Sequence, residues 1–144
     1  MNFHSLYAGI DRPVATCVVG SGGFGQSFLA QARRMKLMTA RIAMDLDAAT
    51  AATALLQAGV ARDGICICST AAEAREAWNN GHHVAAASVD TVMDLPFEVL
   101  VEATGHPESA ARHALTAVEA GRHVALVSKD ADSVVGPGLA RIAR

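Results

Sequence analysis

Short apolar runs alternate with longer segments of helical periodicity along the chain. Runs rich in Val, Ile, Ala and Cys predict strands over residues 14–19, 40–44, 65–68, 98–101 and 123–127, and a weaker run predicts a short extra strand over 84–89. These runs are continuous in their apolar character, which is typical of parallel strands that are covered on both faces.

The segments between the strands carry helix start and stop signals. Apolar residues at helical spacing predict a helix over 24–38. Asp47 is placed to cap a helix over 48–58, Thr70 and Glu73 form a capping box, and Pro107 suits the first turn of a helix that reaches residue 120. Residues 136–138, Gly-Pro-Gly, predict an interruption before a last helical piece.

Repeated alternation of strand and helix predicts parallel βαβ units with right-handed crossovers. We therefore expect an α/β protein with a Rossmann-type, doubly wound parallel sheet in three α/β/α layers. The length of 144 residues suits one domain, residues 1–144, in which residues 1–12 form an N-terminal extension. In such sheets ligands bind outside the carboxyl ends of the strands.

The loop after the first predicted strand holds the main chemical signal, Gly20-x-Gly22-x-x-Gly25. In this pattern the first glycine permits a tight turn, the second lets a pyrophosphate approach the backbone, and the third lets the helix pack close to the strand. Asp45 lies 20 residues after Gly25, at the end of the second predicted strand, where a carboxylate accepts hydrogen bonds from a ribose. Together these residues predict a dinucleotide site.

Other interpretations of the glycine loop are weaker. A P-loop would need a lysine where Gln26 stands, and a kinase glycine loop joins two strands, whereas this loop leads into a helix. An S-adenosylmethionine domain usually carries a carboxylate just before the loop, where this chain has Val18 and Val19. A glycine turn kept for packing alone is the remaining alternative.

Composition narrows the function further. The net charge of −2 does not fit a strongly basic nucleic-acid binder, and no apolar run is long enough for a membrane span. Hydrophobic residues make up 51% of the chain, which excludes a disordered chain. No secretory signal is evident, and three cysteines without a framework spacing favour a reducing, cytoplasmic location.

The sequence carries no pattern typical of a metal site, and it has no GxSxG motif of a hydrolase. Cys66 and Cys68 have no second Cys/His pair at zinc spacing, so we interpret them as thiols on one face of a short strand. None of the six histidines forms a zinc motif, and we predict no metal site. His113 and His123 are interpreted as packing or surface residues, whereas His106 lies at the expected cofactor edge.

Several segments together resemble the cofactor domain of homoserine-dehydrogenase-like oxidoreductases. The most similar branch is that of predicted homoserine dehydrogenases with a C-terminal SAF domain, which includes proteins like deoxyxylulose-phosphate reductoisomerase. The resemblance covers about residues 10–144 and rests on the segments 20–25, 28–34, 43–47, 101–108, 111–115 and 119–124.

The resemblance implies the roles of individual residues. The glycine loop with Gly23 and Phe24 would line the pyrophosphate, Asp45 would meet the adenosine ribose, and Ala103, Thr104 and Gly105 would border the cofactor near its nicotinamide half. Lys129 falls where homoserine dehydrogenases carry an Asn-Lys pair, with Ser128 in place of the Asn, whereas the SAF branch usually has an apolar residue there. Independently, a lysine at a strand's carboxyl end beside a cofactor can move a proton during hydride transfer. The alternative is a solvated surface lysine.

These observations lead to an expected function. NAD is favoured over NADP because the Asp45 carboxylate repels a 2′-phosphate. We expect an NAD(P)-dependent oxidoreductase that transfers a hydride to or from a small polar or phosphorylated substrate, with the substrate domain absent from this chain. The other function class is a non-catalytic dinucleotide-binding module that senses redox state or regulates a partner. Self-association through the edge that would meet a second domain is a further expectation.

Overall fold

A computed structural model describes residue 9 and residues 11–143, so the expected N-terminal extension lies mostly outside the described residues. In the described part, six parallel strands form one sheet in the order β3-β4-β2-β1-β5-β6. The strands are β1 (Val14–Val19), β2 (Met38–Met44), β3 (Ile65–Cys68), β4 (His83–Ala86), β5 (Val99–Glu102) and β6 (His123–Leu126). The predicted doubly wound parallel fold is confirmed.

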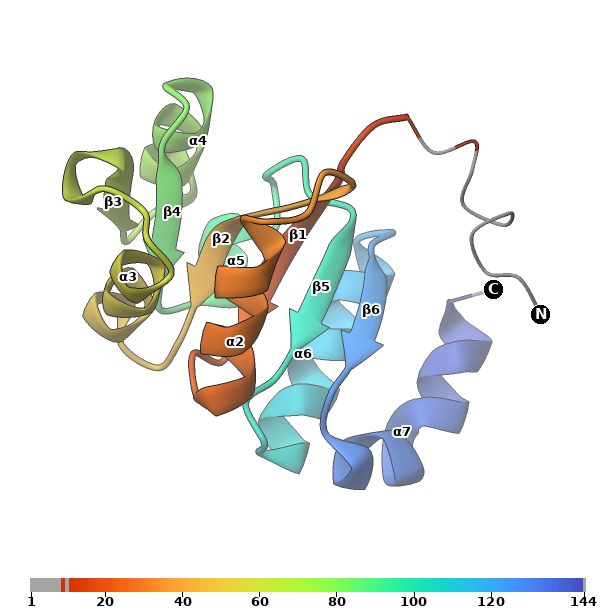
Figure 1. Cartoon of the computed structure of the whole chain (residues 1–144). Coiled ribbons are helices and arrows are strands. Elements are labelled where there is room, and N and C mark those ends of the chain that lie inside the picture. Colours follow the sequence, from red (N-terminus) through yellow and green to blue (C-terminus); the bar gives the residue numbers. More distant parts are fainter. Residues whose placement is uncertain (1–8, 10, 144) are drawn as a thin grey trace.

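Helices cover both faces of this sheet (Figure 1). The helices are α2 (Gly23–Ala32), α3 (Ala48–Gln57), α4 (Ala71–Asn79), α5 (Val89–Val92), α6 (Pro107–Glu119) and α7 (Lys129–Ile142), and a 3₁₀ turn, η1, spans Arg62–Gly64. α2 and α3 pack on one face, whereas α4, α5 and α6 pack on the other, and α7 lies against α6 and β6. The order in which strands are added to the sheet reverses at β1: the strands from β2 to β4 lie on one side of β1, and β5 and β6 lie on the other.

The core is built mainly from aliphatic side chains. Under α2 and α3 it contains Val18, Leu29 and Leu55, and under α4 to α6 it contains Ile42, Phe97 and Leu100. Cys66 and Cys68 face this second core, so both thiols lie on one face of β3 as predicted. Among the described residues, no helix combines the length and the apolar character that a membrane crossing requires.

Helix α2 is shorter than its periodicity predicts, because it ends at Ala32 and not near Met38. Two reverse-turn hydrogen bonds, from the amides of Arg34 and Met35, close the helix. The chain then extends so that Met38 pairs with Val14, and Met35 remains half exposed. Strand pairing therefore prevails over the local helical pattern.

The predicted interruption at residues 136–138 is wrong, because α7 continues through Pro137. A proline ring normally clashes with the β-carbon of the residue before it. Gly136 has no β-carbon, which relieves that clash. The cost is the missing amide of Pro137, which leaves the Ser133 carbonyl without its usual helical donor.

Strand β4 is shorter than the run that predicts it, because it ends at Ala86 and Val89 begins α5. The weak run at residues 84–89 forms an interior strand, His83–Ala86, which pairs with β2 on one side and β3 on the other. The strand at 65–68 therefore forms the edge of the sheet, and its central residue Ile67 is exposed. The burial of Val84, Ala85 and Ala86 is complete, as expected for an interior position.

Candidate functional site

The loop between β1 and α2 is shaped by two of its glycines. Gly20 has a φ of +92°, and a β-carbon there would lie 2.7 Å from the backbone of Ala103 and Thr104. A β-carbon on Gly25 would collide with the carbonyl oxygen of Gly20. These two positions therefore require glycine, one for the turn beside β5 and one for the close packing of α2 on β1.

The other two glycines of the loop are open toward solvent, whereas Ser21 is buried. β-Carbons on Gly22 and Gly23 would meet nothing within 4 Å. Gly22 is the N-cap of α2, and no side chain among the described residues caps this helix. The first-turn amides of α2 are therefore available to a ligand, and the partial positive charge at this helix end favours an anion.

Asp45 joins the end of β2 to the glycine loop. Its Oδ2 accepts a hydrogen bond from the Ser21 amide at 2.7 Å and another from the Ser21 hydroxyl, and its Oδ1 accepts one from the Leu46 amide at 2.8 Å. Partial burial works against ionisation, but these three hydrogen bonds outweigh it and lower the pKa of Asp45. The side chain is therefore a carboxylate that is oriented by the glycine loop itself.

A cavity of about 430 Å³ lies at the carboxyl ends of β1, β2 and β5. Five of the predicted cofactor residues line it: Gly20, Gly22, Asp45, Ala103 and Thr104. The other lining residues come from the same strand ends, from the residue after β4 and from the beginning of α6, namely Val19, Met44, Leu46, Ala87, His106, Ser109, Arg112 and His113. The fold thus brings the glycine loop and Asp45 to one concave surface.

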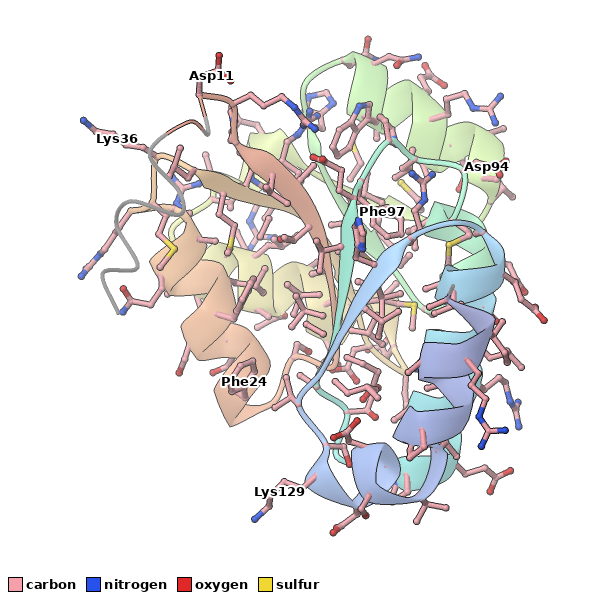
Figure 2. All side chains as sticks on the ribbon, turned by 90° about the vertical axis from the view of Figure 1, so that its right-hand side faces the viewer. Asp11, Phe24, Lys36, Asp94, Phe97 and Lys129 are labelled. Atoms are coloured by element: carbon pink, nitrogen blue, oxygen red, sulfur yellow. The ribbon has the colours of Figure 1, made fainter. Side chains whose placement is uncertain are left out.

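The remaining predicted site residues lie outside the wall of this cavity. Gly23 and Gly25 belong to α2, and Gly105 adopts a φ of +73° in the loop that leads to α6. Phe24 is half exposed and stacks on Phe28, with ring centroids 6.2 Å apart. Figure 2 shows Lys129 pointing outward at the beginning of α7, where it is exposed.

The sequence interpretation missed a buried polar cluster beneath the cavity. Glu102 at the end of β5 is fully buried, and its Oε1 accepts a hydrogen bond from the Thr104 hydroxyl at 2.7 Å. The same oxygen lies 3.4 Å from Nδ1 of His113, which lines the cavity and was expected to be a packing or surface residue. The spacing of His106, Ser109 and His113 on one face of α6 was the available signal.

A second hollow, of about 470 Å³, lies between β6, α6 and α7. Its wall includes Arg122, Leu126 and Leu139, and it contains none of the predicted cofactor residues. Within the residues that the structure describes, no group of three His, Cys, Asp or Glu side chains is arranged to hold a metal ion. The cavity at the glycine loop is therefore the candidate site.

Comparison with solved structures identifies the architecture. GenD2 from gentamicin A biosynthesis, solved in complex with NAD, aligns with 93% of this chain at a TM-score of 0.64 and 19% sequence identity. An NAD-binding protein from Listeria innocua aligns with 92% at a TM-score of 0.56 and 18% identity. This chain has a Rossmann-like fold.

The likeness covers only part of each neighbour's length. The chain spans only 32% of the GenD2 chain and 34% of the Listeria innocua chain. No protein-family model and no curated protein sequence matches it. The resemblance to homoserine-dehydrogenase-like proteins therefore stays a prediction from the motifs.

Proposed function

We propose that this chain binds a nicotinamide adenine dinucleotide, with NAD favoured over NADP, and forms the cofactor-binding part of an oxidoreductase. The observation that carries the proposal is that Gly20, Gly25 and Asp45 come together at the end of β1. The two glycines shape a bare turn at the end of β1, and the carboxylate lies on the wall of the same cavity. The two solved neighbours, one in complex with NAD and one named an NAD-binding protein, support this choice.

The residues present fit such a group. The uncapped first turn of α2 offers backbone amides to a pyrophosphate, and Gly22 leaves room for its approach. Asp45 accepts three hydrogen bonds, two at Oδ2 from Ser21 and one at Oδ1 from Leu46, and a carboxylate offers about four lone-pair positions, so Oδ1 keeps acceptor capacity. Oδ1 can therefore accept from one hydroxyl of a ribose, and Oδ2 can accept from the other when the Ser21 hydroxyl turns away.

The charge of Asp45 supports the preference for NAD. Its lowered pKa keeps the carboxylate ionised at neutral pH, and it lies only partly buried at the cavity wall. A 2′-phosphate would place a second negative group beside it, where like charges repel strongly. The NADP alternative requires a cation near Asp45, and Arg112 is the arginine on this cavity's wall.

A bound nicotinamide ring would supply the hydride acceptor or donor of the reaction. Lys129 is the residue that we assign, on its position after β6 and on the family resemblance, to proton movement at a substrate oxygen. Lys129 is exposed in this chain. A side chain that contacts a substrate held by another domain would also be exposed before that domain is in place. The substrate class, small and polar or phosphorylated, rests on the resemblance alone.

Calorimetric titration of the purified chain with NADH and NADPH tests the proposal. We expect NADH to bind, and NADPH to bind at least about tenfold more weakly because of the charge on Asp45. Gly25→Ala should abolish NADH binding, since its β-carbon pushes α2 away from the Gly20 carbonyl. Gly138→Ala is the matched control, because a β-carbon at Gly138 meets nothing within 4 Å. Absence of NADH and NADPH binding in the natural chain would contradict the proposal.

The exposure of Lys129 favours one second candidate, a dinucleotide-binding module without chemistry of its own. Both candidates predict that Lys129→Met leaves NADH affinity unchanged, because Lys129 does not line the cavity. They differ in turnover. In the longest natural protein that contains this sequence, an oxidoreductase loses substrate-dependent NADH oxidation on Lys129→Met, whereas the module shows no such oxidation with or without the substitution.

A further inference from the structure

Asp45 and residues 103–105 lie on opposite sides of the glycine loop. Asp45 follows β2 and residues 103–105 follow β5, and these two strands are the neighbours of β1 in the sheet. A dinucleotide lies across the point at which the strand order reverses, with its pyrophosphate between its two halves. Because the proposed function places the adenosine ribose at Asp45, the nicotinamide half extends toward the end of β5.

The loop after β5 forms the cavity wall on that side. Ala103 and Thr104 line the cavity, and the Ala103 amide donates to the Val19 carbonyl at 2.7 Å. Backbone atoms of both residues lie only 2.7 Å from the position of a β-carbon on Gly20, so the loop passes directly against the glycine turn. The position of Thr104 therefore determines the shape of the cavity where the nicotinamide half would lie.

Glu102 holds this wall from inside the protein. It is the last residue of β5 and is fully buried. Its Oε1 accepts hydrogen bonds from the Thr104 hydroxyl at 2.7 Å and from the Thr104 amide at 3.4 Å. The Thr104 hydroxyl oxygen in turn accepts one from the amide of His106, the N-cap of α6, at 3.2 Å. One side chain thus fixes the path of the chain from the end of β5 to the start of α6.

A carboxyl group at this position costs free energy. Burial of an ionisable side chain is unfavourable unless hydrogen bonds offset it, and Oε2 of Glu102 is buried without a partner among the described residues. Leu100, two residues earlier on the same face of β5, is fully buried and apolar, so this face of the sheet accepts an apolar side chain. The packing of the sheet therefore does not explain Glu102, whereas its hydrogen bonds to the cavity wall do.

We propose, on the basis of the proposed function, that Glu102 is a positioning residue for the nicotinamide half of the dinucleotide. Glu102 has no exposed surface with which to touch the ligand, so it acts through Thr104. With Thr104 held by Glu102, the cavity wall is formed before the ligand binds, which reduces the ordering cost for a ring that lies against it. Glu102 should therefore affect the binding of the nicotinamide ring and leave the binding of the adenosine half at Asp45 unchanged.

A purely structural role of Glu102 is the alternative. Nδ1 of His113 on α6 lies 3.4 Å from the same Oε1, so Glu102 also joins α6 to the sheet. Loss of that contact would weaken the site as a whole and would lower the affinity for every ligand of the cavity by the same factor. The two roles are therefore separated by two ligands that differ only at the nicotinamide ring.

Calorimetric titration with NADH and with ADP-ribose, in which a hydroxyl replaces the dihydronicotinamide ring, makes this comparison. We expect the natural chain to bind NADH about three- to tenfold more tightly, as one hydrogen bond from the amide of the ring predicts. Thr104→Val and Glu102→Leu should bring this ratio toward one, and the double variant should do no more than either alone. Thr104→Ser and Glu102→Gln, which keep a hydroxyl donor and an oxygen acceptor, should retain the ratio.

Thr53→Val is the matched control, because it also removes a hydroxyl that donates within the chain, to the Ala49 carbonyl at 2.8 Å, and Thr53 does not line the cavity. It should keep the natural ratio. Equal affinities or tighter binding of ADP-ribose in the natural chain, the natural ratio in Thr104→Val or Glu102→Leu, or its loss in Thr104→Ser would overturn the inference, while NADH binding still supports the proposed site. If neither ligand binds, the proposed function fails as well. If Glu102→Leu does not fold, Thr104→Val alone decides.

Discussion

At the residue scale, the Asp45 carboxylate binds the glycine loop, and it is also the proposed acceptor for the hydroxyls of a ribose. The hydroxyl and amide of Ser21 bind Oδ2, so the carboxylate holds the loop in place before any ligand arrives. This arrangement pre-organises the site and reduces the ordering cost of binding. Ser21 occupies a position that the glycine pattern leaves free, so the pattern did not predict its role.

Asp45→Ala is the direct test of this dual role. We expect it to weaken NADH binding by about tenfold or more, because a charged hydrogen-bond acceptor is lost and the loop loses its anchor. Asp47→Ala is the matched control: this neighbouring aspartate caps α3 through the amides of Ala49 and Thr50 and does not line the cavity. Equal NADH affinity in Asp45→Ala and the natural chain would remove Asp45 from the ribose site.

A second residue-scale effect concerns Glu98, which accepts hydrogen bonds from Nη1 and Nη2 of Arg12 at 2.9 and 2.7 Å. Hydrogen bonds from Arg12, and then from the Ala15 amide, lower the pKa of Glu98 from 4.5 to about 2. Because folding lowers this pKa, the ionised carboxylate stabilises the folded chain. That contribution is fully present above about pH 4.5 and is lost as the pH falls toward 2.

Urea unfolding from pH 7 to pH 2.5 measures this contribution. The difference in free energy of unfolding between the natural chain and Glu98→Gln should be positive at pH 7 and shrink steadily below pH 4.5. Glu119→Gln, at an exposed position ending α6, should give a small difference at every pH. A Glu98→Gln difference that does not vary with pH would contradict the assignment.

At the scale of elements, Arg122 connects the start of β6 to the segment between α5 and β5. Its Nη1 donates to the carbonyl of Phe97 at 2.7 Å, and its Nη2 donates to those of Met93 and Leu95 at 3.2 and 3.0 Å. The guanidinium carbon also lies 5.0 Å from the centroid of the Phe97 ring. One side chain therefore binds three carbonyls of this loop, of which that of Leu95 also accepts a hydrogen bond from the Phe97 amide.

We expect Arg122→Met to lower the free energy of unfolding by about 2 to 4 kcal/mol, because carbonyls in a partly buried loop lose a charged donor. Arg75→Met should cost less than about 1 kcal/mol, because Arg75 forms an exposed pair with Asp94 at 3.1 Å. Urea unfolding of the three proteins provides the comparison. Similar losses in the two variants would show that the Arg122 contacts add nothing beyond a surface ion pair.

The bounds of helices and strands were predictable where they depend on neighbouring residues in the sequence. The Asp47 cap, the Thr70–Glu73 capping box and Pro107 at the start of α6 all lie as the sequence predicts, because each depends on neighbours within one turn. The end of α2 and the place of β4 were not predictable, because both depend on which distant strand pairs with them. The continuation of α7 through Pro137 depends on the missing β-carbon of Gly136.

Some residues of the candidate site were likewise predictable from the sequence, and others were not. Gly20, Gly25 and Asp45 follow a spacing that the fold imposes, so the sequence alone located them. The Glu102–His113 contact joins the end of β5 to the second turn of α6 and appears only when that helix packs on the sheet. The pairing of β1 with β2 shifts in register between Thr16 and Cys17, and the apolar pattern does not predict this shift.

At the scale of the whole molecule, two hollows compete for a ligand. One lies at the glycine loop and the other between β6 and α7, on the far side of β5 from β2. Hydrogen exchange separates them, because binding slows exchange where amides are covered or ordered. In the free chain we expect the slowest exchange in β1, which is hydrogen-bonded on both sides, and faster exchange in the edge strand β3.

Addition of NADH should slow exchange at residues 20–25, at Leu46 and at residues 103–105, while β3 and the C-terminal half of α7 stay unchanged. The uncapped amides at the start of α2 should respond most, since they have no side-chain cap among the described residues. Protection centred on Leu126 and Leu139 would instead place the ligand in the hollow beside α7. The carboxyl edge of the sheet would then have no role in binding, even though its glycine loop is correctly formed.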